Sequence, residues 1–192
     1  IETQLAEFGS AIAAARVEIV RLLSGMMEQL PDDGPFPKAD LILEGGIEAL
    51  LSSGVSASDV EDQYRQMLAG NRPRDAAAGR TLDGPHRSDL LVMHRPKSMP
   101  ANLSSTGEQK ALLIGIVLSH ARLVARMTGS APVLLLDEIA AHLDAGRREA
   151  LFGIIDDIGS QAFMTGTDRS LFAALEGRAE FLAVSHGVVS GI

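Results

Sequence analysis

Cysteine is absent from the 192 residues of this chain, which excludes a disulfide framework and a thiolate metal site. No uninterrupted apolar run approaches 18 residues, so no membrane-spanning helix is predicted, and no signal peptide is visible. Internal repeats and low-complexity segments are also missing. These absences fit a protein of the reducing cytoplasm. A chain of this length can bury a sizeable core in one or two domains.

The net charge of −8 argues against a free-standing nucleic-acid binder, but the charge is unevenly distributed. Residues 1–70 carry four Lys or Arg and 12 Asp or Glu, whereas residues 71–110 carry seven and four. Residues 111–192 are again acidic, with six Lys or Arg and nine Asp or Glu. The basic surplus therefore lies in the middle segment.

The most informative stretch is an apolar run that ends in two carboxylates, Pro132 to Glu138, with the sequence Pro-Val-Leu-Leu-Leu-Asp-Glu. Such a run predicts a buried parallel strand, and the carboxyl edge of a parallel sheet is where ligands bind. At that edge Asp137 can hold Mg²⁺ and Glu138 can orient a water molecule. The alternative interpretation of the same pattern is a core strand that ends in two solvated acids with no functional role.

A second pattern lies upstream, where Ser105 to Lys110 read Ser-Thr-Gly-Glu-Gln-Lys before a helix-length apolar segment at 111–127. The first turn of a helix leaves backbone N–H groups free, and the helix dipole favours an anion there. Ser105 adds a hydroxyl donor, and Gly107 lets the backbone approach a phosphate closely. An ordinary helix N-cap has the same composition.

The first 30 residues predict an amphipathic helix that ends at the Pro-Asp-Asp-Gly-Pro segment, residues 31–35. Its large apolar residues recur at alternating spacings of four and three, as in a heptad seam. The seam consists of Ile1, Leu5, Phe8, Ile12, Ala15, Ile19, Leu22 and Met26. Such a helix either packs on a neighbouring element or forms the base of a coiled-coil arm.

Residues 39–43 predict a strand and residues 47–51 a short helix. Ser58 and Glu61 are spaced as in a capping box, which predicts a helix over 59–69 that ends at Gly70. The polar segment 71–80 then predicts a connecting loop and a domain boundary, with a helical lobe over 1–75 and a second domain over 76–192.

Gly84-Pro85 predicts a turn, and residues 90–93 a strand. His86 and Arg87, which follow the turn, can contact phosphate groups. Alternatively the segment is a solvated hairpin in which the arginine pairs with Asp83 or Asp89. Beyond the Asp-Glu pair we expect a helix over 147–157, a strand over 161–165, a helix over 171–175 and a hairpin over 181–189. This alternation favours an α/β fold in which helices cover a sheet.

In order and spacing, these motifs resemble the second half of an ABC-type ATPase head. Residues 105–110 resemble the signature motif, residues 133–138 the Walker B motif, and residues 141–144, with Leu143 and Asp144, the D-loop. The stretch Gly-Pro-His-Arg-Ser-Asp-Leu at 84–90, about 20 residues before the signature, is similar to the RecF family rather than to ABC transporter heads.

The resemblance implies an α/β fold, the C-terminal part of an ABC-type head preceded by a mostly helical lobe. It implies a cytoplasmic, DNA-binding ATPase of recombinational repair that uses ATP and Mg²⁺. Such proteins dimerise on ATP, bind single-stranded or gapped duplex DNA, and act with RecO and RecR to load RecA. No membrane partner is implied.

The resemblance also assigns roles to residues. Glu138 corresponds to the catalytic base and Asp137 to the Mg²⁺ ligand. The D-loop residues are Leu143 and Asp144, and His86 and Arg87 are candidates for DNA or phosphate contact. The signature residues contact a nucleotide held by the second subunit, and they are Ser105, Thr106, Gly107, Glu108, Gln109 and Lys110.

The chain departs from the family pattern in three respects. It has no Gly-x-x-x-x-Gly-Lys-Ser/Thr loop, which normally cradles the phosphates. We therefore expect a C-terminal half that is inactive by itself, within a protein that is active at full length. The signature serine is either Ser104 or Ser105, and anchoring on Gly107 favours Ser105. Where transporter-like heads place a switch histidine, this chain has Thr165 and Thr167 as candidate switch residues.

Two other classes of protein remain in competition. Another chromosome-maintenance ATPase of the SMC type would extend the heptad seam into a long arm, but the loop after Leu30 is short and no long heptad run follows. A piece retained only for protein interaction would have no need of an intact Asp137-Glu138 pair.

Overall fold

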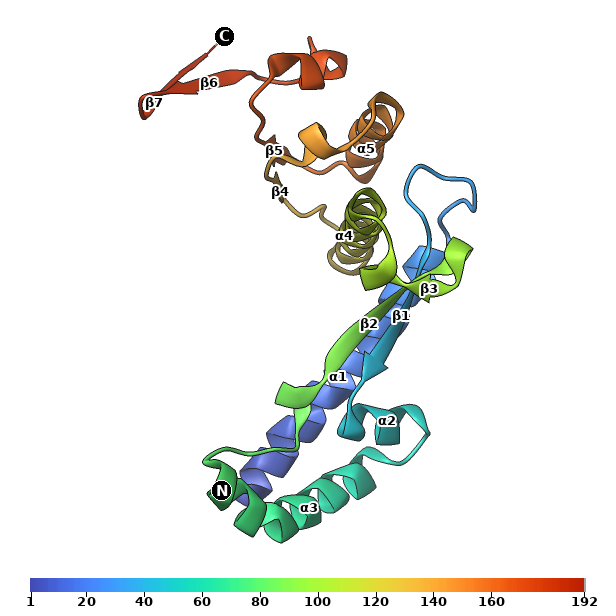
Figure 1. Cartoon of the computed structure of the whole chain (residues 1–192), viewed down its shortest axis with the longest axis vertical. Helices are drawn as coiled ribbons and strands as arrows, with labels where there is room; N and C mark the ends of the chain where they lie inside the picture. The colour runs from blue at the N-terminus through green and yellow to red at the C-terminus, as the bar shows by residue number, and fades with distance from the viewer. Residues whose placement is uncertain (192) are drawn as a thin grey trace. The chain divides into compact units, whose positions relative to one another are not determined.

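A computed structural model of the chain describes residues 1–191 (Figure 1). These residues form two compact units, one over Ile1–Leu123 and a second that begins at Val124.

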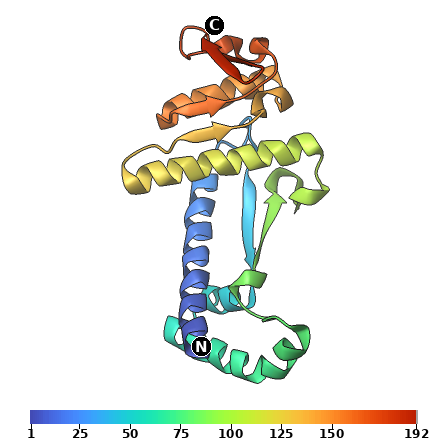
Figure 2. The ribbon, with the colours of Figure 1, turned by 90° about the vertical axis from the view of Figure 1, so that its left-hand side faces the viewer.

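The first unit is built on α1 (Glu2–Glu28), which lies alongside β1 (Ala39–Glu44) in both ribbon views (Figures 1 and 2). Two helices follow, α2 (Gly46–Ser52) and α3 (Ala57–Ala78). The chain then returns through the 3-10 turn η1 (Pro85–Arg87) into β2 (Asp89–His94). The turns η2 (Arg95–Lys97) and η3 (Ala101–Leu103) flank the short strand β3 (Met99–Pro100). Helix α4 (Thr106–Thr128) begins in this unit.

The sheet of the first unit has the order β1-β2-β3, and both pairings are antiparallel. In the β1–β2 register Ala39 lies opposite His94, and Glu44 lies opposite Asp89. The expected strands at 39–43 and 90–93 are therefore confirmed, each with slightly wider bounds.

The core of the first unit has two parts. Small residues of α1 pack on α2 and α3 in one cluster, made of Ala6, Ala13, Ile47, Val60, Tyr64 and Leu68. Larger residues from the end of α1 pack on β1 and α4 around the buried side chains of Leu23, Met26, Met27, Ala39, Leu112 and Leu123. Burial of these apolar side chains holds α1, the sheet and α4 up to Leu123 together.

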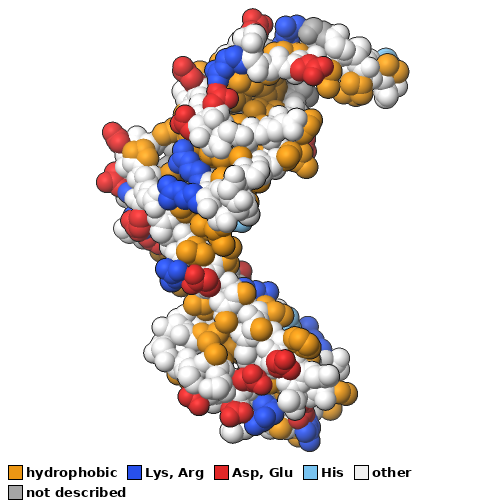
Figure 3. Space-filling model, turned by 180° about the vertical axis from the view of Figure 1, so that it is seen from behind, with side chains coloured by type: hydrophobic (Ala, Val, Ile, Leu, Met, Phe, Trp, Pro, Cys, Tyr) orange, Lys and Arg blue, Asp and Glu red, His pale blue; other side chains and the backbone are white. Residues whose placement is uncertain are grey.

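The heptad seam does not mark the buried face of the first half of α1. Leu5, Phe8, Ile12 and Ile19 remain 41–62% exposed, and apolar side chains are visible at the surface among charged ones (Figure 3). The residues buried there are Ala6, Gly9, Ser10 and Ala13. Small residues occupy the buried face because α3 packs closely there: a Cβ on Gly9 would lie 2.5 Å from the ring of Tyr64.

The predicted bounds of α3 were wrong at both ends. The N-cap is Ser56, whose hydroxyl accepts a hydrogen bond from the Asp59 N–H at 3.2 Å, so Ser58 and Glu61 form no capping box. The helix also continues past Gly70 and through Pro73 to Ala78, and it ends at Gly79 in the left-handed conformation. The loop predicted over 71–80 is therefore mostly helix.

Side-chain contacts with residues outside the helix explain why α3 continues past Gly70 and Pro73. Arg72 forms an ion pair with Glu2, Asn71 donates to Asp83 at 2.7 Å, and the Asp75 carboxylate accepts from the Leu82 N–H at 3.0 Å. Tertiary contacts of this kind commonly override local helix propensity. The structure divides between Leu123 and Val124, whereas the boundary expected near residue 75 stays a prediction.

The second unit contains β4 (Leu134–Leu136), the 3-10 turn η4 (Ile139–His142), α5 (Ala145–Ile158) and β5 (Ala162–Met164). The 3-10 helix η5 (Arg169–Leu175) and the antiparallel hairpin of β6 (Leu182–Ser185) and β7 (Val188–Gly191) complete the described part. Strands β4 and β5 pair in parallel, with Leu135 opposite Phe163. All the elements expected after residue 130 are present, with small changes in their bounds.

Helix α4 is long and apolar enough to cross a membrane by length and composition alone, with a mean hydropathy of 1.4 in its most apolar window. Of that window 44% is buried, and the core helices of globular proteins pass the same test. Its buried residues, among them Leu112, Ile114 and Leu118, belong to the core of the first unit.

Candidate functional site

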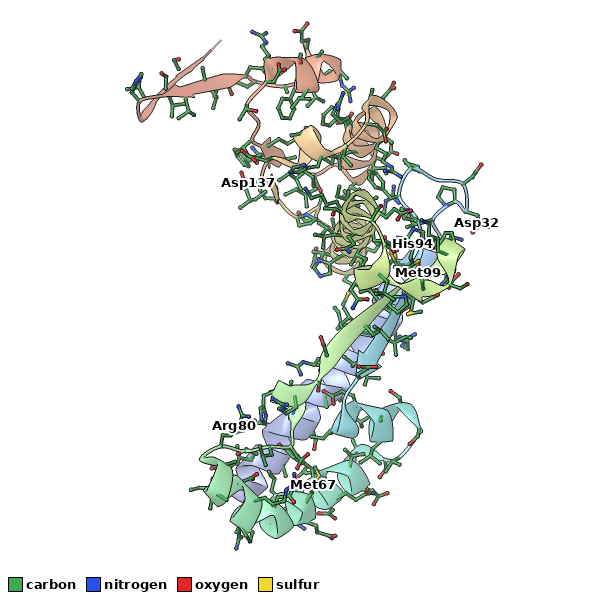
Figure 4. The ribbon with its side chains drawn as sticks, viewed as in Figure 1. Asp32, Met67, Arg80, His94, Met99 and Asp137 are labelled. Carbon is green, nitrogen blue, oxygen red and sulfur yellow. The ribbon has the colours of Figure 1, made fainter. Side chains whose placement is uncertain are left out.

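Two predicted carboxylates lie at the carboxyl end of β4, in the second unit. Leu134 and Leu136 are buried and fix the strand, and Asp137 and Glu138 follow with exposed side chains. Asp137 is labelled in Figure 4. Strand β5 runs parallel beside β4, so its own carboxyl end, at Met164, lies at the same edge. The sheet thus places Thr165 next to the acids.

Thr165 is hydrogen-bonded to both predicted residues. Its hydroxyl donates to Oδ1 of Asp137 and accepts from the backbone N–H of Glu138 at 2.9 Å. The Thr165 N–H donates in turn to the Leu136 carbonyl at 3.1 Å, which extends the β4–β5 pairing by one step. A single hydroxyl therefore orients the Asp137 carboxylate and the backbone of Glu138.

Glu138 has a left-handed backbone, with φ 48° and ψ 20°. That conformation costs a residue with a side chain about 1–2 kcal/mol and persists only where neighbouring contacts hold it. The Thr165 hydroxyl, bonded to the Glu138 N–H, is one such contact. Strain of this kind gathers at functional sites, which favours a role for Glu138 beyond that of a solvated acid.

The residues after the acids form a turn and a helix start. Leu143 is buried, and its carbonyl accepts from Nη1 of Arg148 at 2.5 Å. Asp144 caps α5, because its carboxylate accepts from the Arg147 N–H at 2.9 Å. The D-loop-like pair is thus anchored to α5. Beyond Thr165, Gly166 lies under Phe172, whose ring would be 2.7 Å from a Cβ at that position, while Thr167 is exposed.

The signature-like stretch begins α4, in the first unit. Ser105 and Glu108 form a capping box. The Ser105 hydroxyl and the Ser105 N–H both donate to Glu108 Oε2, at 2.8 and 3.0 Å. The Glu108 N–H donates in turn to the serine hydroxyl at 3.4 Å. Lys97 also pairs with Glu108. The Lys97 ammonium and the Ser105 hydroxyl together lower the pKa of the Glu108 carboxyl to about 2.

The structure separates the two candidate serines of the signature. Ser104 is buried, and its backbone carbonyl accepts from the Gln109 amide at 2.9 Å, whereas Ser105, Thr106 and Gly107 are exposed. Nothing lies within 4 Å of a Cβ built on Gly107, so this turn is open to an approaching group. Lys110 is half-buried on the next turn. Ser105 is thus the accessible serine of the pair, and its role as the signature serine stays a prediction.

The two basic candidates after the Gly84-Pro85 turn differ in their surroundings. His86 engages its Nε2 with the Thr81 carbonyl at 2.9 Å. Arg87 is exposed and has no ion pair within residues 1–191, so neither Asp83 nor Asp89 neutralises it. Asp83 lies instead 3.7 Å from Nη1 of Arg74. Of the two, Arg87 is better placed to contact a phosphate.

The donor set at the β4 edge fits Mg²⁺ only with help from other groups. Within residues 1–191 no three His, Asp or Glu side chains come together as a metal cluster. Mg²⁺ prefers oxygen ligands and is commonly bound through one or two carboxylates together with substrate phosphates. The exposed Asp137 carboxylate meets that requirement.

Sequence reasoning anticipated the residues at the β4 edge but missed two contacts. Thr165 was expected only as a candidate switch residue, in the place where transporter-like heads have a switch histidine, and its bonds to Asp137 and Glu138 depend on the parallel register. Glu48, a buried acid on α2, gave no sequence signal, because a glutamate in a short amphipathic helix is ordinary.

No family model matches the chain. Over 189 residues it is 67% identical to a DNA replication and repair protein RecF of Mesorhizobium japonicum, a match that covers 98% of this chain and 50% of the relative. The RecF protein of Brucella abortus is 64% identical over 193 residues, again half of its length. The chain resembles the C-terminal half of RecF. It spans about half the length of the RecF relatives that it matches.

Two solved RecF structures share the fold. A structure described as the recombination mediator protein RecF-ATP in the RecFOR pathway matches with a TM-score of 0.77 at 22% identity, and its RecF-ATPrS counterpart with 0.80 at 23%. Each match covers all of this chain and 49% of the other. The expected fold class, the α/β C-terminal part of an ABC-type head preceded by helices, is therefore confirmed.

Proposed function

We propose that this chain belongs to a DNA-binding ATPase of recombinational repair, to which it contributes the catalytic carboxylates and the signature motif. The observation that carries the proposal is the hydrogen-bonded group of Asp137, Glu138 and Thr165 at the shared edge of two parallel strands. An edge of this kind is where α/β proteins bind nucleotides. The similarity to RecF over half of that protein supports it, and the activity is assigned to the full-length protein.

Each residue has a defined task in this proposal. Asp137 would hold Mg²⁺ through its carboxylate, and Thr165 donates a hydrogen bond to Oδ1 of that carboxylate. When bound, the ion neutralises charge on the phosphates of ATP. Glu138 accepts a proton from the attacking water, and its left-handed backbone fixes the direction of its side chain.

The remaining candidates complete the proposed site from a second subunit. Ser105 to Lys110 contact the γ-phosphate of a nucleotide held by the partner, so ATP joins two copies in a homodimer, with Leu143 and Asp144 near the interface. The exposed Arg87, and His86 beside it, contact phosphates of single-stranded or gapped duplex DNA. The proposed role, together with RecO and RecR, is to load RecA in the cytoplasm.

Substitution of Glu138 by glutamine in the full-length protein tests the proposal. The variant keeps the shape of the side chain but cannot take a proton, so ATP turnover should fall at least about 100-fold while ATP binding persists and the ATP-bound dimer accumulates. Asp137→Asn provides the contrast: it should weaken ATP binding only when Mg²⁺ is present, because it removes a metal ligand.

Turnover and calorimetric ATP affinity, with and without Mg²⁺, distinguish the two variants. Near-normal turnover by Glu138→Gln would place the base elsewhere. Equal loss of Mg²⁺-free binding in both variants would instead indicate a distorted fold.

A further inference from the structure

The first unit contains a buried acid that the proposed ATPase chemistry does not use. Glu48 of α2 is 1% exposed, although a buried carboxylate is costly unless charges or hydrogen bonds compensate it. Its Oε1 accepts a hydrogen bond from the Ser88 hydroxyl and lies 3.7 Å from Nη1 of Arg16. Its Oε2 has no hydrogen-bond partner within the described residues.

The backbone around Glu48 is shaped to admit this carboxylate. A Cβ on Gly45 would lie 2.2 Å from Glu48 Oε2 and 2.7 Å from the Ser88 hydroxyl oxygen. Gly45 has an extended φ of 177°, so the close approach, and not the backbone conformation, requires glycine there. The acid, the glycine and the serine therefore form one packed arrangement.

The contacts of this arrangement converge on the turn that carries Arg87. Arg16 of α1, the ion-pair partner of Glu48, also donates to the Pro85 carbonyl. Ser88, bonded to Glu48, is the residue directly after Arg87. Arg16 and Glu48 thus hold the two ends of the Pro85–Ser88 turn, while Arg87 between them is exposed and has no ion pair within residues 1–191.

A turn fixed at both ends that carries an exposed guanidinium with no ion pair within the described residues is suited to an anionic ligand. We propose that Glu48, through Ser88, is a positioning residue that presents Arg87 to a backbone phosphate of DNA. This inference rests on the DNA binding included in the proposed function. Free of local ion pairs, Arg87 can form the charge-assisted hydrogen bonds that arginine makes with phosphate.

The test measures the affinity of the full-length protein for a gapped duplex at several salt concentrations. Arg87→Ala should weaken binding about five- to tenfold and reduce the slope of log affinity against log salt by about 0.9, the value for one lost phosphate contact. Ser88→Ala should weaken binding about threefold or more. In the Arg87→Ala background, Ser88→Ala should cause no further loss, because its effect passes through Arg87.

Two further variants separate positioning from stability. Glu48→Gln retains an oxygen that can accept from Ser88 and should keep the affinity within about twofold of the wild type, whereas Glu48→Leu should resemble Ser88→Ala. Arg65→Ala removes an exposed arginine of α3 that pairs with Asp62, and it controls for the loss of one positive charge. Circular dichroism establishes that each variant is folded.

Each contrary result has a distinct meaning. The positioning role would be overturned if the double variant lost affinity by the product of the two single losses, or if Ser88→Ala bound DNA with wild-type affinity. Either result would leave the DNA contact of Arg87 standing. An unchanged salt slope for Arg87→Ala would overturn the inference while DNA binding through other residues survives. A wild-type protein that binds no DNA would overturn both the inference and that part of the proposed function.

Discussion

At the scale of single residues, the hydroxyl of Thr165 does what few side chains can do, since it donates and accepts at once. It donates to the Asp137 carboxylate and accepts from the Glu138 N–H. Only serine and threonine offer both functions at this length. Replacing the hydroxyl by a methyl group removes the hydrogen-bond donor to the Asp137 carboxylate and the acceptor for the Glu138 N–H.

We therefore expect Thr165→Val, a substitution of nearly the same shape, to lower ATP turnover of the full-length protein about tenfold or more. That factor corresponds to about 1.5 kcal/mol, the lower end of the range for a hydrogen bond to a charged group. Because the bond orients Asp137, the Mg²⁺ concentration needed for half-maximal ATP binding should also rise. Turnover and ATP binding are measured across a Mg²⁺ series.

Thr165→Ser serves as the matched control, because it restores the hydroxyl without the methyl group. Recovery of most of the lost turnover would assign the effect to the hydroxyl. Equal loss in the serine and valine variants would assign it to packing near β5 and leave Asp137 to be oriented by other groups.

At the scale of elements, sequence periodicity predicted the helices and strands better than it predicted which elements contact one another. The strands at 39–43 and 90–93 and the helix after Gly107 follow from apolar runs and helix-start residues, which are local properties. Helix α3 was predicted too short because Gly70 is a local stop signal, whereas the ion pair of Arg72 with Glu2 joins residues that lie 70 positions apart in the sequence.

The same distinction explains the candidate site. Asp137 and Glu138 follow an apolar run that any reader of the sequence can find. Their bonds to Thr165 depend on which strand pairs with β4 and in which register. Contacts across 27 or 28 residues, such as these, leave no trace in a window of a dozen residues.

Two glycines in helices provide an element-scale prediction with opposite signs. Gly70 lies inside α3 with nothing within 4 Å of an added Cβ, so Gly70→Ala should raise the free energy of unfolding by about 0.5–1 kcal/mol through reduced chain entropy. Gly9 of α1 faces Tyr64, whose ring would be 2.5 Å from a Cβ, so Gly9→Ala should lower it by about 1–3 kcal/mol.

Denaturant unfolding of the full-length protein, followed by circular dichroism, measures both effects. Destabilisation by Gly70→Ala would mean that α3 ends near residue 70, as the sequence pattern alone predicts. A neutral Gly9→Ala would mean that α1 and α3 are not as closely packed as the contact with Tyr64 requires.

At the scale of the whole molecule, the chain has a stretch that resembles a signature motif and two carboxylates but no Gly-x-x-x-x-Gly-Lys-Ser/Thr loop, and it spans about half the length of the RecF relatives that it matches. In the proposed arrangement ATP completes a site that neither subunit has alone. DNA binding then follows dimerisation, because the basic surplus of residues 71–110 is doubled and brought together only in the dimer.

Ser105→Arg in the full-length protein tests this coupling. An arginine at the exposed start of α4 should block the approach of a partner's nucleotide, so ATP-dependent dimers, hydrolysis and stable DNA complexes should disappear together while ATP affinity of the monomer stays nearly unchanged. The substitution also removes the N-cap of α4, which by itself costs about 1 kcal/mol.

Ser56→Arg is the matched control, because it places the same side chain at the N-cap of α3 and should lose similar stability without losing the dimer. Sedimentation and DNA titrations on both variants, at one fixed salt concentration, decide the matter. Dimers that persist with ATP in Ser105→Arg, or DNA binding that is lost while dimers remain, would show that the signature does not couple nucleotide to DNA.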